Sequence, residues 1–152
     1  MKVSADGAVW TEALVIARAT GQVALPAGAT IGGAVPYTRA NLLGTVSQSG
    51  GVPTGAAMQR GSGANGTFSR FADGTLICVH SLTASTTAAV TWTFPSAFVA
   101  APCVTGTVQA AVLACVTLDA APTTTTATLS VRDKADARRA DVMRLMAVGR
   151  WY

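Results

Sequence analysis

The clearest indication of the fold class is the segment QRGSGANGTFSRFADGTLICVHSLT, residues 59 to 83. Within it, the apolar-rich runs GTFSRF and TLICVHSL flank the tight turn Ala72-Asp73-Gly74. An Asp-Gly pair between two such runs is a strong β-hairpin signal, because the turn needs a positive φ that glycine adopts without strain. The stretch therefore predicts two antiparallel strands, over residues 66–71 and 75–82.

Further strand-like runs follow this hairpin, and the turns between them recur about every ten residues. The runs are AVTWTF (89–94), CVTGTVQ (103–109), VLACVTLD (112–119), TATLSVR (126–132) and the last run, 141–152. The run at 112–119 is nearly all apolar, which is typical of a central strand. Together the runs predict an antiparallel β-sandwich or small barrel. Residues 133–146 are ambiguous, because their helix formers favour a short helix on propensity alone.

Composition limits the class of protein. Of the 152 residues, 50% are hydrophobic and 12% are charged, which is too apolar for a disordered chain. No apolar run approaches the ~20 residues of a membrane span, so we expect no membrane insertion. The net charge is +4, but the basic residues are scattered, which argues against a nucleic-acid partner.

The cysteines and the single histidine predict no cofactor site. Cys78, Cys103 and Cys115 are an odd number at irregular spacing and lie in apolar runs, so we expect buried free thiols and assembly in a reducing cytoplasm. Cys78 and His80 share one face of a strand and could bind a metal together with Cys103 or Cys115. The spacing matches no zinc finger or zinc ribbon, and a packed histidine is the simpler interpretation. In a trimer, His80 could also meet its symmetry mates on the axis.

The N-terminal third predicts an arm rather than a core. Residues 2–26 predict short hairpins with turns at 5–7 and 19–21, and residues 27–66 are irregular and rich in Gly, Pro, Ser and Thr. Forty irregular residues are improbable in a lone compact domain, so we expect an extended arm over 1–58 that lies along neighbouring chains, followed by a domain over 59–152. A low-complexity segment is the alternative. The apolar residues expected at the interface of a homotrimer are Trp10, Leu14, Ile16, Val23, Leu25, Tyr37, Leu42 and Leu43.

The residue types and their spacing give little support for a catalytic site. A glycosidase needs two carboxylates across a cleft, and Asp73 and Asp119 are the best pair, but turn chemistry explains both. The spacing GxGxxG at 61–66 lacks the strand before it and the helix after it that a dinucleotide site requires. The sequence therefore predicts a protein that is not an enzyme.

Several segments, in this order, resemble bacteriophage tail fibres and the spikes of gene transfer agents. Gln59-Arg60-Gly61-Ser62, Ala64-Asn65-Gly66 and Arg70-Phe71-Ala72-Asp73-Gly74-Thr75 are similar to the opening hairpin of the C-terminal domain in that family. The hairpins of residues 4–26, the linker of residues 41–55, the run TWTFPSAF (91–98) with Pro102, and the terminal GRWY are similar as well. Because the chain begins almost inside this pattern, we expect a C-terminal piece of a longer fibre or a shortened fibre gene.

The resemblance implies a homotrimeric, all-β virion protein with a jelly-roll-like sandwich at its tip. It implies a place at the tail tip or on the capsid surface, contacts with other virion proteins of the tail or capsid vertex, and binding of bacterial surface polysaccharide without catalysis. It also favours a loop to about residue 140 and then a closing strand, in place of the helix at 133–146.

Receptor contacts are expected in loops, which usually carry recognition on a rigid scaffold. The candidate loops are 84–87, 95–101, 110–111, 120–125 and 133–139. In the last of these, Lys134, Arg138 and Arg139 would pair with an anionic capsule or lipopolysaccharide, and the alternative is that these charges only keep the surface soluble. Trp92 could stack on a sugar ring, with core packing as the alternative. The rival functions are a structural decoration protein of capsid or tail without a receptor, and a glycan-degrading tailspike.

Overall fold

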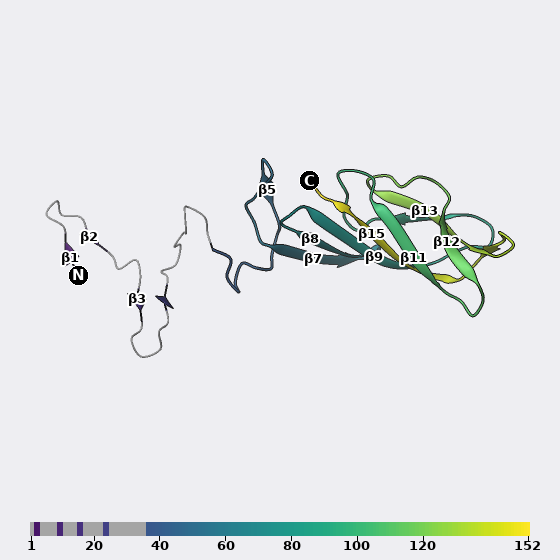
Figure 1. Ribbon diagram of the computed structural model, residues 1–152, viewed down its shortest axis with the longest axis horizontal. Helices are drawn as coiled ribbons and strands as arrows, with labels where there is room; N and C mark the ends of the chain where they lie inside the picture. The colour runs from purple at the N-terminus through teal and green to yellow at the C-terminus, as the bar shows by residue number, and fades with distance from the viewer. Residues whose placement is uncertain (1, 4–8, 11–14, 17–22, 25–35) are drawn as a thin grey trace. The chain divides into compact units, whose positions relative to one another are not determined.

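The computed structural model describes residues 2–3, 9–10, 15–16, 23–24 and 36–152, the first eight of them by backbone alone (Figure 1). All regular elements in these residues are strands, so the chain is an all-β protein, as predicted. It divides into two compact units, residues 1–38 and residues 39–152.

The first unit contains two antiparallel pairs. Strand β1 (Lys2–Val3) pairs with β2 (Val9–Trp10), and β3 (Val15–Ile16) pairs with β4 (Val23–Ala24). These pairs match the short hairpins that the sequence predicts. The turns expected at 5–7 and 19–21 lie outside the described residues.

The second unit is sandwich-like and contains two main sheets. Its strands are β5 (Gln48–Ser49), β6 (Val52–Pro53), β7 (Met58–Gly63), β8 (Gly66–Phe71), β9 (Thr75–Thr83), β10 (Val90–Thr93), β11 (Cys103–Gln109), β12 (Ala114–Leu118), β13 (Thr126–Asp133), β14 (Arg138–Arg139) and β15 (Val142–Arg150). The five-stranded sheet has the order β11-β15-β9-β8-β7, and the four-stranded sheet has the order β10-β13-β12 with β14 on β13. Strands β5 and β6 form a separate small hairpin.

The hairpin predicted from Asp73-Gly74 is confirmed. Strand β8 pairs with β9 in antiparallel register, Arg70 opposite Leu76. The Gly74 N–H donates to the Phe71 carbonyl at 3.0 Å, and Gly74 has a φ of 93°. The Asp73 carboxylate accepts a hydrogen bond of 2.8 Å from the Thr75 N–H. The positive φ therefore belongs to Gly74, and Asp73 fixes the turn through its side chain.

The core lies between the two sheets. Trp92 and Leu129 come from the four-stranded sheet, and Leu76, Met143 and Leu145 come from the five-stranded sheet; each is at most 2% exposed. Strand β10 alternates as a half-buried strand does, because its threonines are exposed while Trp92 is buried. Trp92 Nε1 donates to the Asn65 carbonyl at 3.0 Å, which ties the β7–β8 turn to the opposite sheet.

The structure shows which secondary structure residues 133–146 adopt and where the strand predicted at 112–119 lies in its sheet. The closing strand expected after residue 140 is confirmed as β15, and the helix alternative is wrong. Strand β15 pairs with both β9 and β11 and buries Met143, Leu145 and Ala147 at every second position, which is a strand period. The prediction that 112–119 forms a central strand is wrong, because β13 takes the centre and β12 lies at the edge.

The second unit begins earlier than the domain that the sequence predicts, at residue 39 instead of 59. Backbone hydrogen bonds join this added segment to the sandwich: Gly44 N–H donates to the Met58 carbonyl at 3.0 Å, and Met58 N–H donates to the Leu42 carbonyl at 3.1 Å. Val46 is 3% exposed and Ala56 is 8% exposed. The pairing of a Gly-rich segment depends on its neighbours rather than on its own apolar pattern.

The last residues fasten the β8–β9 turn. Trp151 Nε1 donates to the Phe71 carbonyl at 2.8 Å, and the Tyr152 hydroxyl donates to the Ala72 carbonyl at 2.9 Å. Arg150 donates to the Asp73 carbonyl at 3.2 Å. The terminal GRWY thus has a structural role, which its charge and aromatic content alone do not indicate.

Candidate functional site

The sandwich has two ends that differ in their connections. Ala72 N–H donates to the Ala57 carbonyl, and Met58 pairs with Phe71, so the chain enters beside the β8–β9 turn. We call this the near end. Because β15 and β9 run antiparallel, with Val142 opposite Thr83, the other ends of these strands form the far end. The loops 84–89, 110–113 and 134–137 lie there (Figure 1).

This arrangement sorts the candidate receptor loops. Loops 84–87, 110–111 and 133–139 belong to the far end, where Ala114 lies directly opposite Asp133. Loops 95–101 and 120–125 belong to the near end, where Phe98 N–H donates to the Thr124 carbonyl and Val99 N–H donates to the Arg150 carbonyl. The sequence alone does not indicate which of these loops lie at the same end of the sandwich.

The arginines of the charged loop 133–139 are paired with carboxylates that lie outside the loop. Arg138 Nη1 lies 3.2 Å from Asp119 Oδ2, and Arg139 Nε lies 2.6 Å from Asp141 Oδ2. The Asp133 carboxylate accepts hydrogen bonds from the Ala137 and Ala135 N–H groups, which lower its pKa. Of the three cations expected to bind a glycan, Lys134 alone has no ion pair within residues 36–152.

Trp92 does not reach the surface. Its side chain is 1% exposed, stacks on His80 with ring centroids 6.1 Å apart, and meets Phe94 edge-to-face at 4.9 Å. The core-packing alternative therefore holds for Trp92, and its place among the receptor contacts is corrected. The same stacking identifies His80 as a packed histidine.

Three of the residues expected at a trimer interface have described side chains. Tyr37 is 51% exposed, Leu42 48% and Leu43 66%. Leu43 also lines a shallow hollow of about 410 Å³ with Met58 and Arg60. Leu14 and Leu25, and the side chains of Trp10, Ile16 and Val23, lie outside the described residues.

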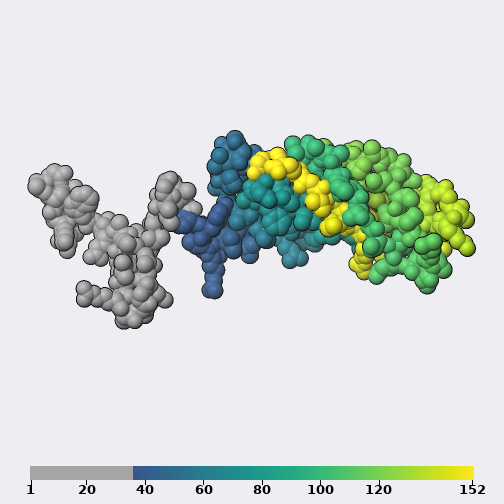
Figure 2. All heavy atoms as spheres, viewed as in Figure 1, coloured from purple at the N-terminus to yellow at the C-terminus, as the bar shows by residue number. Residues whose placement is uncertain are grey.

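The outer face of the five-stranded sheet, which we call the open face, carries unpaired charge and exposed apolar groups. Val79 and Met146 lie opposite each other and are 44% and 40% exposed. Strand alternation and register place these side chains on it: Arg60, Thr67, Ser69, Ile77, Val79, Ser81, Cys103, Thr105, Thr107, Arg144, Met146 and Val148. None of these is acidic, and Figure 2 shows β15 as a yellow band across the visible side of this unit.

The outer face of the four-stranded sheet, which we call the closed face, is covered by its own ion pairs. The Asp119 carboxylate lies 3.3 Å from Arg132 Nη2 as well as 3.2 Å from Arg138. Although partial burial opposes ionisation of Asp119, hydrogen bonds from Ser130, Arg138 and Arg132 hold its pKa below the usual value. Ser130 is 0% exposed and its hydroxyl lies 2.9 Å from that of Thr117. Charge and hydroxyl groups on this face therefore satisfy one another.

The cysteines and carboxylates do not assemble into a reactive cluster within residues 36–152. Cys78 is buried, but Cys103 and Cys115 are exposed, so the prediction of buried thiols is wrong for two of the three. Cys103 and Cys115 lie on edge strands and point outward, whereas Cys78 points into the core, so the suggested metal set is not brought together. The described residues contain no group of three potential metal ligands. Asp73 and Asp119 each have their own local partners.

The glycine-rich spacing at 61–66 forms the β7–β8 hairpin, with Gly63 opposite Gly66. A side chain at Gly66, which has a φ of 106°, would collide with the Val79 carbonyl.

Neither models of known protein families nor the curated proteins gave a match to this chain. Among the described residues, no helix has the length and apolar content that crossing a bilayer requires.

Proposed function

We propose that this chain is a virion fibre or spike subunit of a tailed phage or gene transfer agent, and that its sandwich binds host surface glycan without catalysis. The observation that supports the proposal most is the division between the two ends of the sandwich. The chain enters at the near end, and three loops extend from the far end. A terminal receptor-binding domain requires this arrangement, because the attachment to the shaft must leave the recognition surface free.

The far end offers a more limited set of contacts than the sequence predicts. Arg138 and Arg139 are held by carboxylates, so we assign the binding surface to Lys134 and the apolar loop beside it. In that loop, Val112 is 56% exposed and Leu113 is 77% exposed. An apolar contact flanked by one cation suits a sugar ring with an acidic substituent, and the backbone of the loops supplies hydrogen-bonding groups.

Trimerisation belongs to the same proposal. A single shallow site of this kind binds weakly, and threefold repetition would raise the apparent affinity through avidity. The exposed apolar residues Leu42 and Leu43 of the second unit suit contacts between copies, and Tyr37 of the first unit is exposed as well. Light scattering in native buffer is expected to give the mass of three chains at micromolar concentration. A monomeric mass would contradict the trimer.

Binding can be tested on an array of bacterial capsular polysaccharides and lipopolysaccharides. The variant Val112→Ser/Leu113→Ser/Lys134→Ser is expected to lose at least about tenfold in affinity for whichever glycan the wild-type protein binds. Val99→Ser is the matched control, since Val99 is 59% exposed at the near end. Equal losses in both variants, or in neither, would remove the far end from the site.

The same array separates the rival functions. A wild-type trimer that binds no glycan favours a structural decoration protein of capsid or tail. New reducing ends released from a bound polysaccharide favour a glycan-degrading tailspike. Binding without release is the expected result.

A further inference from the structure

Strand β9 is longer than its neighbour on one side. Strand β8 pairs with β9 only as far as Thr67 opposite Val79, and β9 continues to Thr83. On its other side, β9 pairs with β15 along its whole length, Thr83 lying opposite Val142. Gly66, the first residue of β8, lies beside His80. Residues 81–83 therefore have a strand on one side, and none among the described residues on the other.

The alternation of backbone groups shows which of them face the open side. Ala84 N–H donates to the Asp141 carbonyl at 3.0 Å, so Ala84 faces β15. In an antiparallel pair, the residues that exchange hydrogen bonds alternate along each strand, so Leu82 and His80 also face β15. The N–H and C=O groups of Ser81 and Thr83 then face the open side. Both residues are exposed, and no hydrogen bond joins these groups to any described residue.

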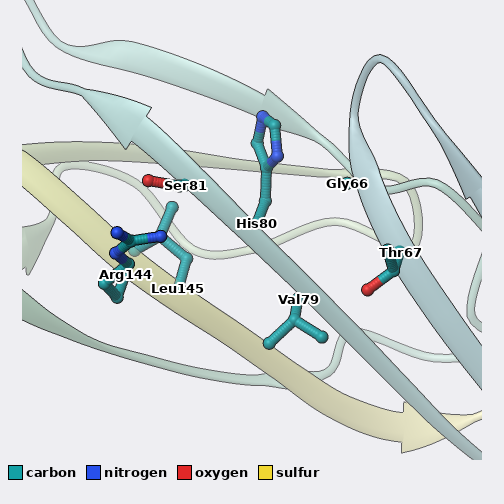
Figure 3. Close-up of a pocket in the computed structure, with 7 residues that line it drawn as sticks. All are labelled: Gly66, Thr67, Val79, His80, Ser81, Arg144 and Leu145. Atoms are coloured by element: carbon teal, nitrogen blue, oxygen red, sulfur yellow. The ribbon is translucent and has the colours of Figure 1, made fainter.

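A hollow lies beside this unpaired edge. Its volume is about 340 Å³, and its lining residues are Gly66, Thr67, Val79, His80, Ser81, Arg144 and Leu145 (Figure 3). On the inner side, His80 and Leu82 are only partly buried although they face the other sheet, because no strand continues β8 beside them. Leu82 and Val90 pack against the edge of the core there. A side chain that enters from this edge would cover apolar surface.

The charge beside the hollow has one sign. Arg144 lies opposite Ser81, on the outer side of the sheet, and has no ion pair or hydrogen bond within the described residues. The small Ser81 side chain lies between Arg144 and the open edge, so the long guanidinium side chain can extend across it (Figure 3). No acidic residue lines the hollow.

We propose that the open half of β9 binds an extended polypeptide strand that carries an acidic side chain. The backbone of the partner would pair with Ser81 and Thr83, as in other cases of strand addition to an exposed sheet edge. Its alternate side chains would point inward onto His80 and Leu82 and outward toward Arg144. This binding surface reaches the far end at Thr83, but it is a sheet edge and not the loop surface of Val112, Leu113 and Lys134, and its use does not depend on glycan recognition.

Two other occupants fit less well. Pairing of β9 with β9 of a second copy would leave both Arg144 side chains without an acidic partner, because no acidic residue lines the hollow of either copy. A glycan could bond to the backbone groups, but it lacks the alternating side chains that reach both the apolar inner side and Arg144. An acidic strand satisfies the backbone groups, the apolar edge and the charge together.

Amide hydrogen exchange on the full chain tests the proposal. In the free protein, the Ser81 and Thr83 amides are expected to exchange much faster than those of His80 and Leu82, which bond to β15. The probe is the peptide acetyl-Thr-Val-Glu-Val-Thr-Val-amide, with a second peptide carrying Lys in place of Glu as its match. The Glu peptide is expected to slow exchange at Ser81 and Thr83, and the Lys peptide is expected to bind roughly threefold to tenfold more weakly.

Two variants make the result specific. Arg144→Gln is expected to abolish the preference for the Glu peptide while leaving the fold unchanged, because Arg144 is exposed and unpaired. Ser81→Pro removes a donor that the free protein does not use and is expected to abolish binding of both peptides. Slow exchange of Ser81 and Thr83 in the peptide-free protein would overturn the proposal, because the edge would already be occupied. Equal binding of the Glu and Lys peptides, or no protection by either, would overturn it as well.

Discussion

The closed face and the open face of the sandwich are both formed by antiparallel strands, but they differ in whether their charged side chains are paired within the described residues. On the closed face, Asp119 joins Arg132 and Arg138 above the buried hydroxyl of Ser130. On the open face, Arg60 and Arg144 have no ion pair within residues 36–152, and Val79 and Met146 stay exposed. Buried polar groups must find partners, and exposed ones need not, so the closed face is satisfied within the chain.

The difference indicates where other molecules can bind. A partner at the closed face would have to compete with existing ion pairs, whereas a partner at the open face would meet unpaired arginines and uncovered apolar side chains. The difference also shows that a high density of charged residues in the sequence does not identify the charges that are free to bind a partner. The region with the densest charge, residues 132–141, contains the arginines that are most fully paired.

The largest expected effect concerns the thiols, since each face exposes one cysteine and the core holds the third. Burial raises the pKa of Cys78 to about 11, so its alkylation by maleimide at pH 7.5 should be slower than that of Cys115 by at least roughly a hundredfold. If copies pack on the open face, Cys103 should react more slowly in the assembled protein than after dilution to monomer, while Cys115 should not change. Mass spectrometry of labelled peptides gives the three rates. Parallel slowing of Cys103 and Cys115 would show that the two faces do not differ in this respect.

The second prediction compares one charge from each face. Asp119→Ala removes both ion pairs of the closed face beside a buried serine and should lower the free energy of unfolding by roughly 1–3 kcal/mol. Arg144→Ala removes an exposed, unpaired charge and should change it by no more than about 0.5 kcal/mol. Urea denaturation of both variants measures the contrast. Similar losses would mean that Arg144 has a partner in the native assembly.

The third prediction concerns the hairpin that places β9 in the open face. Gly74→Val puts a branched side chain at a φ of 93° and against the Arg150 guanidinium, and should cost about 1–2 kcal/mol of stability. Gly63→Val is the matched control, because nothing lies within 4 Å of the added Cβ and the φ is not positive. Thermal or urea denaturation compares the two, and a stable Gly74 variant beside a destabilised Gly63 variant would contradict the turn assignment.

The smallest expected effect comes from His80, which lies at the open edge of β9. Burial lowers its pKa, so the folded protein favours the neutral imidazole. The unfolded chain takes up a proton near its ordinary value of about 6.5, and stability should therefore fall modestly as the pH decreases from about 7 to 5. His80→Gln should reduce this slope in urea midpoints. An unchanged slope in the variant would assign the pH dependence to other groups.

The all-β class and most of the strands after residue 66 could be predicted from local patterns in the amino-acid sequence. Alternation of apolar and polar residues is a local property with a period of two, and it identifies β10 and β11 without knowledge of their partners. The Asp73-Gly74 turn is similarly local, because the φ of Gly74 is set by four successive residues. The expectation for the closing strand is confirmed by β15, although helix propensity pointed elsewhere.

Long-range packing in the folded molecule sets which of these strands is central, which charges are paired and which side chains are accessible. Strand β12 is as apolar as a central strand, yet it lies at an edge, and Trp92 resembles a sugar platform in sequence but packs on His80. Arg138 meets Asp119 across 19 residues of chain and Tyr152 meets Ala72 across 80, distances at which sequence spacing carries no information. Long-range pairing depends on how the sheets stack, and that is the reason why the open edge at Ser81 could be found only in the folded molecule.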